Sequence, residues 1–185
     1  DIQSNRDIFF HFHNPNSIER HNFLRYYPQA KFLVITRNPI QSLESWMMLT
    51  IQRETLTQNP TYKDIQDSMN WIHTWKTLVQ KIIDIFSQMR VSNSEENNAV
   101  GVRLEDIKRN PKITIPKIAQ WIGISDHPTL YESSFCGLQY WGPSSKATKK
   151  ITGFDTKSVD QKLGKLFSPR DVMIFETLFW PYSNL

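Results

Sequence analysis

The sequence is poor in the residues that build disulfides, multi-cysteine metal sites and glycine-rich phosphate loops. Cys136 is the only cysteine, which excludes a disulfide within the chain and a metal site with several cysteine ligands. The 185 residues include six glycines, and the first of them is Gly101. No Walker-type glycine-rich motif occurs anywhere in the chain, so a nucleotide site of that type is not predicted.

Long apolar runs and a strong charge of one sign are also lacking. No stretch approaches the roughly 20 apolar residues of a membrane span, and the first seven residues do not form a signal peptide. The net charge of +4 suits an anionic ligand, but the basic residues form no stripe, so a nucleic-acid partner is not predicted. The single cysteine is compatible with a reducing compartment, which favours a cytoplasmic location.

What is present is enough for a packed core. Hydrophobic residues make up 39% and aromatic residues 12% of the chain, the composition of a folded domain. We expect one partial domain over residues 1–185, cut from a longer protein, because the chain has no initial methionine.

Strand and helix patterns alternate along the chain. Apolar runs predict strands over 8–12, 31–36 and 99–104, and helical spacing predicts helices over 39–54, 62–89, 113–122 and 169–179. A shorter helix after Ser17 should end at Pro28. This order predicts an α/β fold, with a parallel sheet between helices in three layers. The continuous apolar run of residues 31–36 predicts burial on both faces, and Trp71, Trp75 and Trp121 are expected in the core.

The motif Thr36-Arg37-Asn38-Pro39 stands where a strand ends and a helix begins. Asn38 is a good helix cap and Pro39 suits the first helical position. Ligands of open α/β sheets bind at this edge, and a helix amino terminus favours anions. The fork of Arg37 suits phosphate, and Ser45 lies two turns along the helix. The alternative is a solvated Arg37 and an ordinary surface serine.

Residues 31–39, followed by Ser45-Trp46, resemble the 3′-phosphate-binding segment of the sulfotransferases. Residues 102–107, 142–145 and 168–171 resemble later segments of that family in the same order, so the resemblance covers roughly residues 9–185. It implies a P-loop NTPase-like sulfotransferase fold, incomplete at its amino terminus. It also implies that Arg37 and Ser45 hold the 3′-phosphate of the donor 3′-phosphoadenosine 5′-phosphosulfate (PAPS).

A histidine pair precedes this segment. His13-Asn14-Pro15 resembles the context in which the family often places its catalytic histidine, so His13 is the candidate base and His11 the reserve. A neutral imidazole can accept the proton of an attacking hydroxyl near pH 7. The alternative is a pair of structural histidines. A metal site is not predicted, because no third ligand has suitable spacing.

A polar loop near the carboxyl end is the second donor-binding candidate. The family folds a late basic loop over the nucleotide 3′-phosphate, and the resemblance assigns that position to Ser144, Ser145, Lys146, Lys149 and Lys150. The alternative is a solvated lysine-rich loop.

The resemblance therefore predicts transfer of a sulfuryl group from PAPS to a hydroxyl of a carbohydrate or small metabolite, without a metal. The family's amino-terminal loop for the 5′-phosphosulfate contains glycine, and no glycine precedes Gly101. We expect these residues alone to be inactive. The alternatives are a catalytically inactive nucleotide- or glycan-binding module of the same fold, and a P-loop kinase relative that uses ATP and magnesium.

Overall fold

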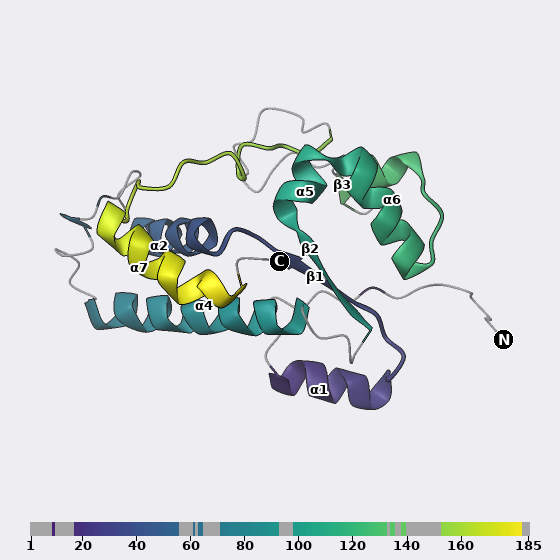
Figure 1. Ribbon diagram of the computed structural model, residues 1–185, viewed down its shortest axis with the longest axis horizontal. Coiled ribbons are helices and arrows are strands. Elements are labelled where there is room, and N and C mark those ends of the chain that lie inside the picture. Colours follow the sequence, from purple (N-terminus) through teal and green to yellow (C-terminus); the bar gives the residue numbers. More distant parts are fainter. Residues whose placement is uncertain are drawn as a thin grey trace.

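The computed structural model describes Phe9 and residues 17–55, 61, 63–64, 71–92, 98–132, 134–135, 138–139 and 153–182 (Figure 1). The predicted strand over residues 8–12 lies outside this part of the chain except for Phe9. Phe9 is not part of a strand, and its side chain is 72% exposed.

The helices and strands follow the predicted order closely. The helices are α1 Ser17–Tyr26, α2 Pro39–Thr55, α4 Trp71–Ser92, α5 Leu104–Arg109, α6 Pro111–Ile122 and α7 Pro169–Phe179. The strands are β1 Phe32–Thr36, β2 Ala99–Arg103, β3 Ser134–Phe135 and β4 Leu138–Gln139. The helices predicted from residues 39, 113 and 169 are confirmed within two residues at either end. The short elements α5, β3 and β4 were not predicted.

Strands β1 and β2 pair in parallel, with Phe32 opposite Ala99 and Thr36 opposite Arg103. The connection between them passes through α2 and α4, which is the helical crossover that parallel neighbours require. The predicted α/β class is confirmed. Both strands therefore end at the same edge of the sheet. The residues that follow them, Arg37 and Leu104, lie close together at that edge.

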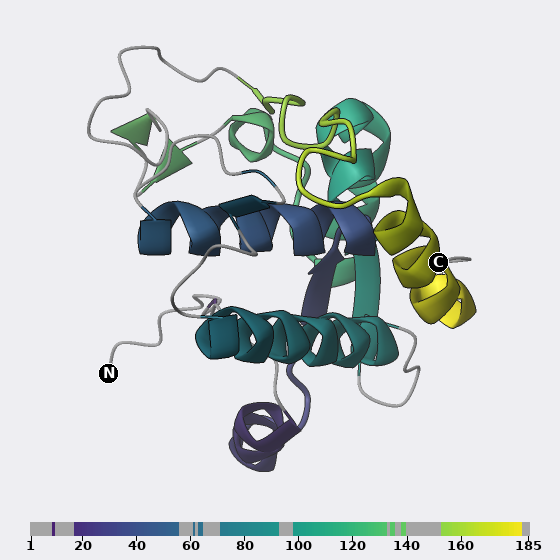
Figure 2. The same cartoon turned by 90° about the vertical axis from the view of Figure 1, so that its left-hand side faces the viewer.

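Helices lie on both sides of the two strands. Helix α4 contacts β1 and β2, α2 packs beside α4, and α7 packs on α2. Figures 1 and 2 show these three helices on one side of the strands and α6 on the other. Lys31 joins the start of β1 to the end of α6, because its ammonium group donates to the carbonyls of Trp121 and Ile122 at 2.7 and 3.1 Å.

The buried core lies between α2, α4, α7 and the segment that leads into α7. Its members are Ile40, Leu43, Met47, Ile51, Ile85, Met89, Leu166, Phe167 and Phe179. Trp75, expected in the core, is 47% exposed, so that prediction was wrong. Trp75 lies in the first turns of α4, whereas the buried residues of that helix, Ile85 and Met89, lie toward its other end.

The expected burial of β1 on both faces is also only partly met. Ile35 is 51% exposed, while its neighbours Val34 and Thr36 are half-buried. The apolar run therefore predicted the strand correctly and its burial only in part.

Candidate functional site at the carboxyl ends of the strands

The turn between β1 and α2 is built by its own sequence. The Asn38 side-chain oxygen accepts the backbone N–H of Gln41 at 3.0 Å, which confirms the predicted cap, and Pro39 opens the helix. The Gln41 side chain does not return to Asn38. It donates instead to the carbonyls of Val159 and Gln161, at 3.5 and 2.8 Å. The helix start is thereby fastened to a segment about 120 residues away.

Arg37 is the first residue of this turn, directly after β1, and is half-buried. One terminal nitrogen donates to the carbonyl of Ser158. Its Nε–H is buried and has no hydrogen-bond partner among the described residues. Burial lowers the pKa of Arg37, and the negative charge of Glu105 acts in the opposite direction. A half-buried guanidinium with an unused donor is suited to bind an anionic ligand.

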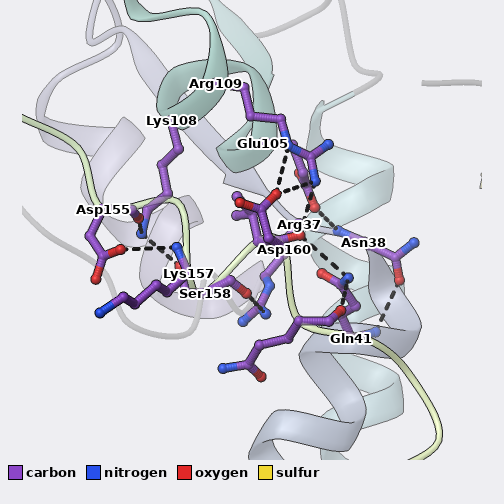
Figure 3. Close-up of polar contacts among 12 residues, drawn as sticks. Arg37, Asn38, Gln41, Glu105, Lys108, Arg109, Asp155, Lys157, Ser158 and Asp160 are labelled. Atoms are coloured by element: carbon purple, nitrogen blue, oxygen red, sulfur yellow. Dashed lines mark hydrogen bonds and ion pairs between the residues drawn. The ribbon is translucent and has the colours of Figure 1, made fainter.

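Glu105 approaches the same turn from the neighbouring strand. It lies in the first turn of α5, directly after β2, and is only 5% exposed. One carboxylate oxygen, Oε1, accepts the backbone N–H of Asn38 at 2.8 Å, whereas Oε2 is buried and has no partner in the part of the chain that the structure describes. Figure 3 shows Glu105, Arg37 and Asn38 meeting at the strand ends.

Residues 153–168, which we name the clasp, cross this edge of the sheet on their way to α7 (Figure 1). Lys108 holds the clasp from α5, since its ammonium group donates to the Asp155 carbonyl at 2.7 Å and to the Ser158 hydroxyl at 2.6 Å. Because Ser158 also accepts from Arg37, the clasp connects α5 with the β1–α2 turn.

Arg109 makes the next contact with the clasp. Its guanidinium donates to the Val159 carbonyl at 3.1 Å and forms an ion pair with Asp160 at 2.9 Å. Hydrogen bonds from the Thr156 side chain and from Arg109 hold the pKa of Asp160 below its usual value. The ion pair is about half exposed, so its contribution is modest.

Glu44 fastens the other end of the clasp to α2. Its Oε1 accepts three backbone N–H groups, those of Gly164, Leu166 and Phe167, at 3.2, 2.7 and 3.0 Å. The side chain is 5% exposed. This carboxylate therefore fixes the backbone of the clasp just before α7 begins.

A cavity of about 700 Å³ opens beside Arg37 at the carboxyl ends of the strands. Both strand ends, α7 and the last turns of α4 contribute to it. Its lining consists of Thr36, Arg37, Asn38, Pro39, Ile40, Met89, Arg103, Leu163, Met173, Glu176, Thr177, Phe179 and Trp180. The walls are largely apolar with a few charged groups, which is the usual character of a small-molecule site.

The sequence-predicted residues are only partly described. Ser45 lies two turns into α2 with an exposed side chain, and none of the described contacts joins it to Arg37. The other candidates lie outside the described residues: His11, His13, Ser144, Ser145, Lys146, Lys149 and Lys150. Sequence reasoning missed Glu44, Lys108 and the clasp. Glu105 stood in a noted motif without a role, although its position after a parallel strand could have placed it beside Arg37.

Comparison with known proteins supplies the family. The model of the sulfotransferase family matches residues 3–128, which is more than half of the chain. The chain belongs to the sulfotransferase family. The matched span includes Arg37, Ser45 and Glu105, and it ends before the clasp. No curated protein matches this sulfotransferase chain.

A solved structure shares part of this sulfotransferase chain's arrangement. It is described as a sulfotransferase domain from the curacin biosynthetic pathway, with 14% identity and a TM-score of 0.44. The alignment covers 81% of this chain and 53% of that domain, so the chain spans about half of its length.

The described residues contain neither a cluster of metal ligands nor a membrane-spanning helix. Within those residues, no three His, Cys, Asp or Glu side chains gather as metal ligands. None of the helices described there has the length and apolar character needed to cross a bilayer.

Proposed function

We propose that this chain carries the 3′-phosphate-binding part of a sulfotransferase whose sulfuryl donor is PAPS. The observation that carries the proposal is Arg37, a half-buried guanidinium at the start of α2 whose Nε–H lacks a partner among the described residues. A phosphate oxygen would accept from that nitrogen, and the amino terminus of α2 favours the same charge. The adjacent cavity of about 700 Å³ gives a ligand room beside Arg37.

Other residues would complete the donor site. Ser45 would add a hydroxyl hydrogen bond from the exposed side of α2. The loop residues proposed to fold over the phosphate are Ser144, Ser145, Lys146, Lys149 and Lys150. Their hydroxyl and ammonium groups are donors that suit phosphate oxygens.

The proposed reaction is a direct transfer to a hydroxyl of a carbohydrate or small metabolite. His13, or His11 in its place, accepts the hydroxyl proton as the oxygen attacks sulfur. The bond between sulfur and the 5′-phosphate oxygen breaks, and 3′-phosphoadenosine 5′-phosphate leaves with the electron pair. Arg37 and Ser45 hold the nucleotide and take no part in the proton transfer.

Calorimetric binding of 3′-phosphoadenosine 5′-phosphate tests the proposal. We expect the unchanged chain to bind this nucleotide with micromolar affinity. Arg37→Ala should weaken the affinity about 100-fold, because a charge-assisted bidentate contact is lost, and Ser45→Ala should weaken it about tenfold. Arg53→Ala, an exposed arginine in the last turn of α2, and Ser87→Ala, whose hydroxyl bonds within α4, are the matched controls. Both controls should bind like the unchanged chain.

The outcomes separate the candidate functions. Equal affinity in Arg37→Ala and the unchanged chain would contradict the assignment of the phosphate site. Binding that depends on Arg37, with no sulfuryl transfer by the full-length protein to any hydroxyl acceptor, would instead favour a nucleotide-binding module that has lost catalysis.

A further inference from the structure

A buried carboxylate stands where the proposed function places an anion. Glu105 is 5% exposed, and its Oε2 has no hydrogen-bond partner among the described residues. A negative charge beside a phosphate repels it, and an unpaired buried oxygen costs stability. Both costs call for a compensating role, because buried polar groups are normally paired.

The contacts of Glu105 indicate what that role is. Its Oε1 holds the Asn38 N–H at 2.8 Å, and Asn38 in turn caps α2 through Gln41 at 3.0 Å. The carboxylate thus fixes the backbone on the carboxyl side of Arg37. Because β1 and β2 are in register up to Thr36 opposite Arg103, Glu105 reaches this turn from the first turn of α5, directly after β2, rather than from a loop.

The side chain of Arg37 is also constrained. The Ser158 carbonyl accepts from its terminal nitrogen, and the negative charge of Glu105 opposes the lowering of the Arg37 pKa by burial. An arginine fixed by such a hydrogen bond is preorganised, so less conformational freedom is lost when a ligand binds.

We propose that Glu105 is a positioning residue of the phosphate site, which sets the Asn38 amide and the Arg37 guanidinium so that the site accepts a phosphate at the 3′ rather than the 2′ position of the ribose. The proposal rests on the proposed function. It predicts that removing this negative charge reduces the preference for the 3′-phosphate, whereas relief of charge repulsion alone would strengthen the binding of both isomers and leave the preference unchanged.

The test compares adenosine 3′,5′-bisphosphate with adenosine 2′,5′-bisphosphate by calorimetry on the full chain. The two isomers carry the same charge, so the ratio of their dissociation constants reports geometry. We expect the unchanged chain to prefer the 3′ isomer, and Glu105→Gln to reduce that preference about tenfold, because a neutral amide oxygen accepts the Asn38 N–H less strongly than a carboxylate and carries no charge. A general loss of folding, or a change in the electrostatic potential of the site, alters the affinities for the two isomers by the same factor and leaves their ratio unchanged.

Two matched controls accompany this variant. Asp106→Asn removes a negative charge from the same turn of α5. The Asp106 side chain is half-exposed, and its Oδ2 lies 3.9 Å from Nε of Arg103. Glu44→Gln alters the other buried carboxylate, whose contacts are with the clasp backbone. Neither should change the isomer ratio, although Glu44→Gln should lower stability.

Each outcome decides a different claim. An unchanged or increased isomer preference in Glu105→Gln overturns the positioning role, while Arg37-dependent binding leaves the proposed function in place. No isomer preference in the unchanged chain overturns the proposed function itself. If Glu105→Gln fails to fold, Glu105→Asp keeps the charge and shortens its reach to Asn38. A full isomer preference in Glu105→Asp would overturn the positioning role as well.

Discussion

The regions around Glu44 and Glu105 bury a carboxylate to the same degree, 5% exposed, and surround it differently. Glu44 accepts three backbone N–H groups of the clasp. Glu105 accepts one, from Asn38, and its second oxygen has no partner among the described residues. A carboxylate that accepts several backbone N–H groups stabilises the fold around it, whereas one with an unpaired buried oxygen reduces stability and is retained where a site uses it. Hydrogen bonding, rather than burial, distinguishes these two roles.

The largest effect on stability should come from Glu44→Ala. The change leaves the N–H groups of Gly164, Leu166 and Phe167 without their acceptor, and two of these residues are buried. We expect a loss of roughly 3–5 kcal/mol in the free energy of unfolding, measured by urea denaturation. Glu132→Ala at an exposed position is the control and should change it by less than about 0.5 kcal/mol.

The stability of Glu44→Ala also tests directly whether the two buried carboxylates differ in their effect on the fold. A loss below about 1 kcal/mol in Glu44→Ala would mean that the clasp backbone finds other acceptors. Glu44 would then stabilise the fold no more than Glu105 does, and the distinction between the two regions would fail.

A smaller effect is expected where α5 meets the clasp. Lys108→Met removes hydrogen bonds to the Asp155 carbonyl and the Ser158 hydroxyl and keeps much of the aliphatic side chain. We expect a loss of about 1–2 kcal/mol, because one cation makes both bonds near the surface. Hydrogen exchange should be faster at residues 155–160 and unchanged in α2.

Lys117→Met on the exposed side of α6 is the matched control for this variant. Equal exchange at residues 155–160 in both variants would show that Lys108 does not hold the clasp. Faster exchange in Lys108→Met that extends into α2 would show that the regions around Glu44 and Glu105 unfold together.

The sequence predicted what depends on neighbouring residues. The Asn38 cap, the end of α6 at Ile122 and the start of α7 at Pro169 each follow from a few adjacent side chains. The two strands and their parallel pairing followed from apolar runs separated by helices. The six-residue α5 was missed, because it is too short for a helical period to show.

The contacts of the site could not be predicted from neighbouring residues, because they join distant parts of the sequence. Glu105 meets Asn38 across 67 residues, and Glu44 meets the clasp across 120 to 123. No local pattern encodes such pairs, because tertiary packing brings them together. The resemblance to a family directed attention to Arg37 and Ser45, whose binding roles stay predictions. It assigned no role to the carboxylates that surround the turn.

The smallest predicted effect concerns the exposed ion pair between Arg109 and Asp160. Hydrogen bonds from Thr156 and Arg109 lower the pKa of Asp160 below its reference value of 3.8, so the carboxylate stabilises the fold above that pH. This contribution is lost as the pH falls through the lowered pKa of the folded state. The unfolding free energies of the unchanged chain and Asp160→Asn should therefore differ by a constant amount between pH 7 and about 5, and converge below 3.8.

Denaturation of both proteins across this pH range, with Arg109→Gln beside them, is the measurement. Arg109→Gln removes one of the two main causes of the lowered pKa, so it should shrink the pH-dependent difference without abolishing it. A difference that does not decline as the pH falls below 3.8 would contradict the role of the ionised carboxylate. Since the pair lies at the exposed rim of the clasp, added salt should weaken its contribution and leave that of Glu44 nearly unchanged.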